Sequence, residues 1–295
     1  PLIVNKGKGL TRNKEKVKTK KTFVFDLDET IGSFSDLYYL FKCVEKIQKT
    51  RNIILYENDE ILLFALLDLF PEFFRYGISI LFQYLYEKKK SQEVNVYIYT
   101  NNKCIPITWT SIIIRYIENK WNIPNLFDNI ILAFKIDNKI VEYNRTTNEK
   151  THHDLIKCLR IPMNTEMCFI DNIDFPKMRH RHVYYLRPKP YYHYVDRFII
   201  IERFIHSNFG VNMMHKLTIN FEECNEIFKN WYTENNHSMK KFIKTKQEVD
   251  TDILVSKKLL YHCKIFFFYS IKKLKTHKFK KITKNLTKKK RANTI

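Results

Sequence analysis

Short apolar runs that end abruptly in polar residues alternate with stretches of helical periodicity between residues 22 and 190. Runs of the first kind are typical of strands buried on both faces, and apolar positions three or four apart are typical of helices. This pattern predicts strands at 22–25, 94–99, 127–134, 166–170 and 183–186, with a turn at 137–139 between two further short strands. It predicts helices at 35–49, 59–70, 72–88, 106–121 and 149–160, the third of them opened by Pro71.

Strands that alternate with helices indicate right-handed crossovers and a mainly parallel sheet. In such sheets ligands bind beyond the carboxyl ends of the strands. Three of the predicted strands end there in polar clusters, which are Asp26 with Asp28, Thr100 with Asn101, and Asp171 with Asn172. We therefore expect one site in which these three clusters meet.

The composition fits one α/β domain with extensions, because 295 residues that are 44% hydrophobic can bury a sizeable core. The six cysteines include no C-x-x-C pair, which argues against a zinc site and against a disulfide framework. The chain starts without a secretory signal pattern, and its longest candidate membrane run, 265–271, is far below the roughly 20 residues that a span needs. We expect an intracellular protein, cytoplasmic or nuclear, with no membrane insertion.

The net charge of +21 is concentrated at the two ends. Residues 1–21 carry eight Lys or Arg and one acid, and residues 256–295 carry fourteen and no acid, so residues 22–255 are formally neutral. Basic ends favour nonspecific contact with nucleic acid through phosphates, which would be salt-dependent. A nuclear localisation signal or a flexible, solvent-exposed end explains the C-terminal basic run equally well.

The pair Asp26 and Asp28 directly follows the first predicted strand. Two carboxylates so close together repel each other unless a cation lies beside them. Mg²⁺ is a natural partner, since one or two carboxylates and a substrate phosphate usually hold it. An acidic turn or a helix N-cap is the alternative, and the buried strand before the pair favours the site.

The segment Asp26-Leu27-Asp28-Glu29-Thr30 resembles the D-x-D-x-T motif of haloacid dehalogenase superfamily phosphatases. It is most similar to the D-L-D-E-T form in phosphatases of the RNA polymerase II C-terminal domain, the NLI-interacting-factor-like family. Uncharacterised proteins of large DNA viruses carry a similar D-L-D-E-T-I-G-S-F opening. The resemblance covers about residues 22–190, and it implies a Rossmann-like three-layer α/β/α fold with a mainly parallel sheet.

The resemblance also implies a role for each polar residue. Asp26 would be the nucleophile and a Mg²⁺ ligand, and Asp28 would be the general acid and base whose backbone carbonyl also holds the metal. Thr100 and Asn101 would bind the phosphoryl oxygens, and Lys150 would neutralise their charge, with Lys157 and Arg145 as alternatives. Asp171 and Asn172 would complete the metal sphere, Asn172 as the direct ligand.

The chain departs from the C-terminal-domain phosphatases at residues 31–70, which look helical where those enzymes carry a small β insertion. Such insertions choose the substrate, so substrate identity does not transfer. We expect a basic arm at 1–21, a phosphatase core at 22–205 with a helical cap at 31–70, a helical extension at 206–255 and a basic tail at 256–295. The expected function is a Mg²⁺-dependent phosphomonoesterase, nominally for phosphoserine or phosphothreonine proteins. The alternatives are a nucleic-acid end phosphatase or nucleotidase, and a non-catalytic viral structural or nucleic-acid-associated protein.

Overall fold

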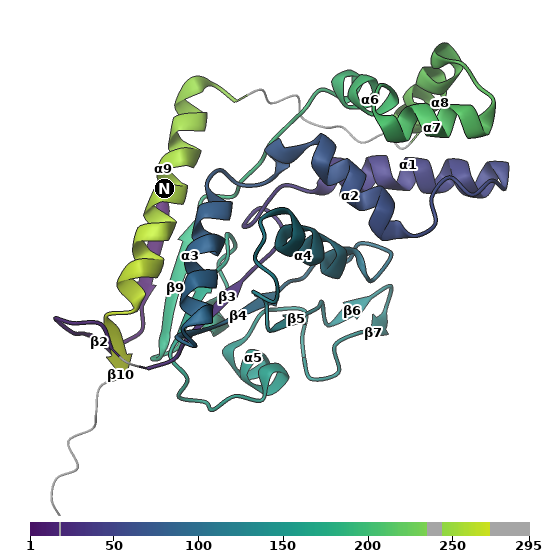
Figure 1. The fold of residues 1–295 in the computed structure, drawn as a ribbon. Coiled ribbons are helices and arrows are strands. Elements are labelled where there is room, and N and C mark those ends of the chain that lie inside the picture. Colours follow the sequence, from purple (N-terminus) through teal and green to yellow (C-terminus); the bar gives the residue numbers. More distant parts are fainter. Residues whose placement is uncertain (18, 235–243, 272–295) are drawn as a thin grey trace, which may run out of the picture.

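The structure is a computed structural model that describes residues 1–17, 19–234 and 244–271. Its main sheet has six strands in the order β1-β9-β8-β3-β4-β5. The five parallel strands are β3 (Lys21–Phe25), β4 (Val94–Tyr99), β5 (Asn129–Ile131), β8 (Met167–Ile170) and β9 (Val183–Pro188), and β1 (Leu2–Lys6) joins the edge in antiparallel orientation. The fold is therefore α/β with a mostly parallel central sheet, as the sequence predicts (Figure 1).

Helices cover both faces of this sheet, so its central strands have no solvent-facing side. On β3, Phe23 and Phe25 point to one face and Val24 to the other, and all three side chains are fully buried. The first face is covered by α3 (Ile78–Lys90) and α9 (Lys246–Phe266), and the second by α5 (His152–Leu159). Burial on both faces explains why these strands read as continuous apolar runs.

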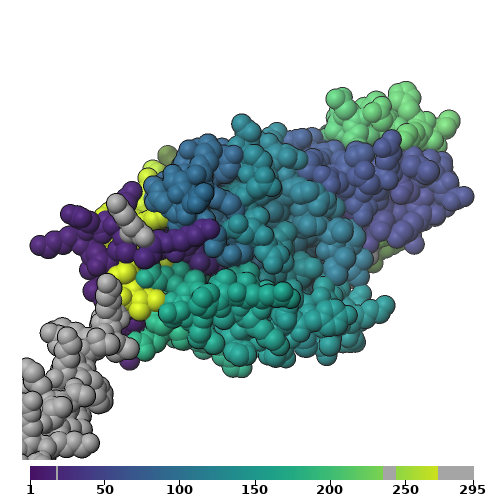
Figure 2. All heavy atoms as spheres, turned by 60° about the horizontal axis from the view of Figure 1, so that its bottom comes forward, coloured from purple at the N-terminus to yellow at the C-terminus, as the bar shows by residue number. Residues whose placement is uncertain are grey.

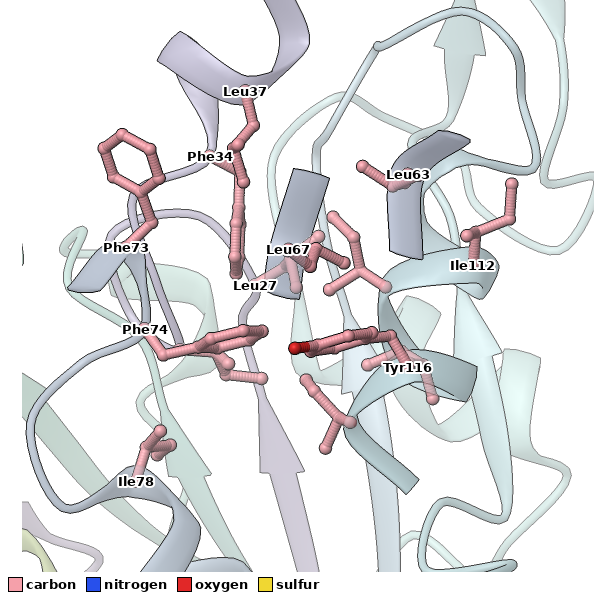
Figure 3. Close-up of a cluster of buried hydrophobic side chains, with 14 of the residues drawn as sticks. Leu27, Phe34, Leu37, Leu63, Leu67, Phe73, Phe74, Ile78, Ile112 and Tyr116 are labelled. Carbon is pink, nitrogen blue, oxygen red and sulfur yellow. The ribbon is translucent and has the colours of Figure 1, made fainter. Parts of the chain in front are cut away.

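A group of helices gathers at the end of the molecule near the carboxyl ends of the strands (Figure 1). The group consists of α1 (Ser35–Arg51), α2 (Asp59–Leu69), α4 (Trp109–Lys120), α6 (Arg197–Ile205), α7 (Asn208–Leu217) and α8 (Phe221–Glu234). Figure 3 shows how apolar side chains join it to the core: Leu27, just after β3, lies among residues of α1, α2 and α4. There Phe74 stacks on Tyr116 with ring centroids 5.8 Å apart. The helices expected at 31–70 thus form one layer with helices from beyond residue 196.

Several predicted elements are shorter than expected, including the helices at 106–121 and 149–160, which are present as α4 and α5. The helix at 72–88 is replaced by the 3-10 turn η1 (Pro71–Phe73) and by α3, which starts only after Gly77 at φ +67°. The intervening residues bond to the loop after β3 instead, since Ser33 N donates to Phe73 O and Arg75 N to Ile31 O. The strand expected at 127–134 is reduced to β5, which pairs with β4 and forms an edge of the sheet among the described residues. The hairpin around 137–139 is present as β6 (Lys135–Ile136) and β7 (Lys139–Ile140).

The two ends of the chain differ from the expected arm and tail. β1 belongs to the main sheet, and β2 (Leu10–Arg12) pairs with β10 (Tyr269–Ile271). The expected boundary between 255 and 256 falls inside α9, whose buried positions Val255, Leu259 and Cys263 recur at helical spacing under the exposed lysines. Residues 272–295 of the expected tail lie outside the described residues. None of the described helices combines the length and the apolar character that a membrane span requires.

Candidate functional site

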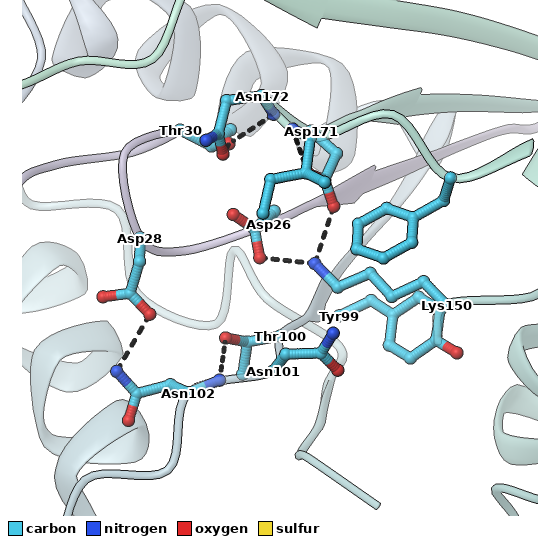
Figure 4. A network of polar contacts seen from close by, with 12 residues as sticks. Asp26, Asp28, Thr30, Tyr99, Thr100, Asn101, Asn102, Lys150, Asp171 and Asn172 are labelled. Atoms are coloured by element: carbon cyan, nitrogen blue, oxygen red, sulfur yellow. Dashed lines mark hydrogen bonds and ion pairs between the residues drawn. The ribbon is translucent and has the colours of Figure 1, made fainter. Parts of the chain in front are cut away.

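Three neighbouring strands deliver the predicted polar residues to one edge of the sheet. Asp171, Asp26 and Thr100 are the first residues after β8, β3 and β4, which lie side by side in that order. Backbone bonds continue the ladder into these positions, as Asp26 N donates to Ile170 O at 2.9 Å and Asp171 N to Leu186 O at 3.2 Å. Each of the three residues is at most 6% exposed. The clusters that the sequence places at separate strand ends form one polar site (Figure 4).

Lys150 connects two of these strand ends. It lies just before α5, and its ammonium forms an ion pair with Asp26 and another with Asp171 Oδ2 at 2.7 Å. Only 1% of its side chain is exposed, and the rings of Tyr99 and Phe175 flank its ammonium at 5.6 and 5.4 Å. The expected helix at 149–160 included Lys150, whereas α5 begins only at His152, so Lys150 lies in the loop before α5 with its ammonium held between two carboxylates.

The charges at this site do not balance within the described residues. Burial alone would lower the pKa of Lys150, but Asp171 and Asp26 outweigh it and raise that pKa, so the ammonium stays protonated. Burial raises the pKa of Asp171 to about 7, with the Asp26 carboxylate adding to the rise and Lys150 opposing it. One ammonium thus faces three carboxyl groups, those of Asp26, Asp28 and Asp171, and the excess negative charge favours a further cation.

Asp28 lies on the open side of the site, partly exposed, and differs from Asp26 in its surroundings. Its Oδ2 accepts a hydrogen bond from Asn102 Nδ2 at 2.9 Å, and Asn102 N in turn donates to Thr100 Oγ1 at 2.9 Å. Burial and the nearby Asp26 carboxylate raise the pKa of Asp28 to about 7. Asp28 can therefore carry a proton near neutral pH, as a general acid must.

Thr30 ties the loop after β3 to the loop after β8. Its hydroxyl donates to Asn172 Oδ1 at 2.8 Å and accepts from Asn172 N at 3.1 Å, while Asn172 Nδ2 donates to Glu29 Oε2 at 3.0 Å. The Asn172 amide is thereby held in one orientation, with its oxygen toward the D-x-D-x-T loop. Thr30 was given no role in the sequence analysis, although the threonine of the D-x-D-x-T motif was a signal that could have found it.

Arg75 holds the backbone of the same loop and was missed by the sequence analysis. Its guanidinium donates to Thr30 O and Glu29 O, both at 2.6 Å, and to Lys189 O at 2.9 Å, and its side chain is 1% exposed. Glu29 has φ +59°, a left-handed conformation that costs a non-glycine residue about 1–2 kcal/mol. The buried arginine stabilises this turn, which sets the direction of Asp28.

The remaining candidates take supporting or distant positions. Thr100 is fully buried, and the Asn101 side-chain oxygen accepts a hydrogen bond from Arg145 Nη2 at 2.7 Å. Arg145 also donates to Thr100 O at 3.1 Å and Leu132 O at 2.7 Å, so it braces the loop after β4. Lys157 is exposed on α5 and has no ion pair within the described part of the chain. Of the three cations considered, Lys150 alone contacts Asp26.

The oxygen atoms around Asp26 match the ligand preference of Mg²⁺ better than that of a softer metal. Among the described residues no three His, Cys, Asp or Glu side chains form a metal-binding group. Both Asp171 oxygens are occupied, by Lys150 and by the Ile173 amide at 2.8 Å. Asp26 has one carboxylate oxygen beyond its bond to Lys150, and Asn172 Oδ1 retains a second lone pair. The protein therefore offers few free oxygen ligands. Such a site suits Mg²⁺, because Mg²⁺ usually keeps several bound water molecules and takes substrate phosphate as a further ligand.

A pocket of about 310 Å³ opens beside Asp28. It is lined by the start of α1, by the loop after β4 and by the first residue of α4, through Phe34, Ser35, Tyr38, Tyr39, Asn102, Lys103, Cys104 and Trp109. The helical layer thus forms one wall of the approach to Asp28.

Neither the models of known protein families nor the curated proteins give any match to this chain.

Proposed function

We propose that this chain is a Mg²⁺-dependent phosphomonoesterase of the haloacid dehalogenase type, with a phosphorylated protein as its nominal substrate. One observation carries the proposal: Asp26 and Asp171, directly after two adjacent parallel strands, share the buried ammonium of Lys150, while Thr100 directly follows β4, the neighbour of β3 on its other side. Asp28, with a raised pKa, lies beside them. These are the residue types, in the order along the chain, that the D-x-D-x-T resemblance requires.

In the proposed reaction the Asp26 carboxylate attacks phosphorus and forms an aspartyl-phosphate as the bond to the leaving oxygen breaks. The Asp28 carboxyl gives its proton to that oxygen, so an alcohol leaves. In the second step Asp28, now ionised, removes a proton from water, and the water oxygen displaces Asp26 from phosphorus. Inorganic phosphate and the original carboxylate result, and Asp28 regains its proton.

Each supporting residue has a part that its surroundings favour. Lys150 would offset negative charge on the phosphoryl oxygens and on Asp26, and Thr100 would donate a hydrogen bond to one of those oxygens. Asp26 and the Asn172 amide oxygen, with the Asp28 carbonyl, would hold Mg²⁺, while Asp171 would orient Lys150. When bound, Mg²⁺ would neutralise phosphate charge so that an anionic nucleophile can approach.

Hydrolysis of p-nitrophenyl phosphate by the full chain tests the proposal. We expect turnover with Mg²⁺ that falls to background in EDTA and returns when excess Mg²⁺ is added, because the uncompensated carboxylates would repel the substrate. Release of phosphate from a phosphoserine peptide and from 3′- and 5′-phosphorylated oligonucleotides would then be compared. Absence of turnover on every substrate with Mg²⁺ present would instead favour a non-catalytic protein.

The raised pKa of Asp28 predicts a pH dependence. Because the acid form is needed to protonate the leaving oxygen, kcat/KM should fall about tenfold per pH unit above pH 7 with an alkyl phosphate. Replacement by asparagine should remove this limb and slow the alkyl substrate by roughly 10²–10⁴-fold. In kcat/KM, which reports on formation of the aspartyl-phosphate and not on its hydrolysis, p-nitrophenyl phosphate, whose leaving group needs no proton, should lose much less. An equal loss on both substrates would contradict the assignment of Asp28 as general acid.

A further inference from the structure

A recess with a strongly basic lining lies where the N-terminal segment crosses the start of β9. It has a volume of about 420 Å³, and four of the ten residues that line it are Lys or Arg while none is acidic. Three of its basic residues, Arg179, His180 and Arg181, belong to the loop before β9, and Lys8 follows β1. We call the surface formed by Lys8, Arg179, His180 and Arg181 the arm–loop surface.

The backbone of this surface is held in place by close contacts. Gly7 N donates to Val183 O at 2.9 Å, and Gly9 N donates to Arg181 O at 2.8 Å. A Cβ atom at Gly7 would come within 2.4 Å of the His180 carbonyl oxygen, so this approach requires glycine. Lys8 lies between the two glycines, so these backbone contacts hold its backbone next to the 179–181 loop.

Several donors at this recess have no partner among the residues that the structure describes. Lys8 and Arg181 are exposed and form no ion pair with any described residue, whereas Arg179 pairs with Asp174. The side-chain amide nitrogen of Asn5, which also lines the recess, is buried without a hydrogen-bond partner in the described part of the chain. A buried donor left unpaired is costly, and gathered cations repel one another, so an anionic acceptor would relieve both.

Further cations extend the surface along the same segment. The exposed residues that follow are Arg12, Lys14, Lys16 and Lys20, with Glu15 as the one acid among residues 1–17 and 19–20. This segment is anchored, because β2 pairs with β10 and Asn13 N donates to Phe268 O at 2.7 Å. Figure 2 shows it in purple, exposed at the end of the molecule opposite α7 and α8.

We propose that the arm–loop surface binds the phosphate backbone of nucleic acid. Cations such as Lys8 and Arg181, which have no ion pair among the described residues, and the Asn5 donor line a recess and an extended segment, a shape that suits a polyanionic strand better than a plane of lipid headgroups. Contacts of this kind are independent of sequence and depend strongly on salt. The surface lies toward the amino ends of the parallel strands, since Val183 pairs with Met167 at the start of β8, whereas Asp26 and Asp171 lie at the carboxyl ends. It is thus a second site, separate from the proposed phosphatase site and independent of it.

Fluorescence anisotropy with a labelled single-stranded oligonucleotide and its duplex, at several salt concentrations, tests this proposal on the full chain. The variant Lys8→Gln/Arg181→Gln should bind at least tenfold more weakly and lower the salt slope by about two, since each lost phosphate contact removes about one. The matched control Lys46→Gln/Arg51→Gln removes the same charge from two exposed residues of α1 at the other end of the molecule, which form no ion pair with a described residue, and it should stay within twofold of the native chain. Equal losses in both pairs would overturn the proposal, because net charge or the C-terminal run would then explain binding.

Two further measurements keep the test decisive. If thermal unfolding shows that Lys8→Gln/Arg181→Gln is destabilised, Lys8→Gln/Lys14→Gln, which leaves the 179–181 loop unchanged, should give the same loss of affinity. Binding to phosphatidylserine vesicles is measured in parallel. Native chain that binds vesicles but neither oligonucleotide would overturn the proposal in favour of a lipid surface.

Discussion

Replacing Asp26 by asparagine is expected to abolish phosphatase activity, lowering kcat by at least about 10³-fold, while the chain keeps its fold. The amide is isosteric with the carboxylate but cannot form the aspartyl-phosphate. Lys150 retains its ion pair with Asp171, and one of three crowded carboxyl groups is neutralised, so the free energy of unfolding should change by less than about 1 kcal/mol. Turnover of p-nitrophenyl phosphate and urea unfolding measure the two effects.

The matched control is Asp137→Asn, the same change at an exposed turn between β6 and β7. It should leave kcat unchanged. A phosphorylated intermediate, trapped by acid quench from a ³²P-labelled substrate, should form on the native chain and be missing from Asp26→Asn. Turnover of Asp26→Asn at the native rate would refute the covalent mechanism.

The meeting of three strand ends was predictable because it follows from topology. Parallel neighbours present their carboxyl ends at one edge, so polar residues directly after three buried strands had to come together there. The bounds of β4 agree with the predicted strand at both ends, since both faces of that strand are buried and the apolar run is continuous. The choice of Lys150 did not follow from topology, because Lys157 lies on the same predicted helix, 149–160, and spacing alone does not tell the two lysines apart.

Arg75 could not be found in this way. Its partners are the backbone carbonyls of Glu29, Thr30 and Lys189. Every residue has a backbone carbonyl, so the sequence does not indicate which carbonyls accept from an arginine. The same reason explains the missing turn of the predicted third helix, where bonds to the distant loop after β3 outweigh local helix propensity.

The place of the N-terminal segment was misjudged because charge was weighed above strand pattern. Its lysines indicated a basic arm, but β1 pairs with β9 along five residues and closes one edge of the sheet. Edge strands with lysine are common, since the charge discourages pairing with another chain. Net charge therefore described the basic character of this segment but did not indicate that it pairs with the sheet.

Lys150→Met should destabilise the protein more than any other change at the site. It leaves the buried carboxyl groups of Asp26 and Asp171 without their shared cation, and removing one partner of a buried ion pair costs about 3–5 kcal/mol. The loss should be smaller at pH 5.5 than at pH 8, because the Asp171 carboxyl, whose pKa is already raised, can then take up a proton. Urea unfolding at the two pH values measures the difference.

Two further variants, a matched control and a compensating double variant, test the reason given for this loss of stability. Lys157→Met makes the same substitution at an exposed position of α5 and should change stability by less than about 0.5 kcal/mol at either pH. The double variant Lys150→Met/Asp171→Asn also neutralises one of the two carboxylates that have lost their cation, so it should regain part of the stability at pH 8. It should not regain activity, because the positive charge beside Asp26 is still missing. If Lys150→Met unfolds like Lys157→Met at both pH values, the ammonium is not locked between the two carboxylates, and the electrostatic basis of the proposed site fails with it.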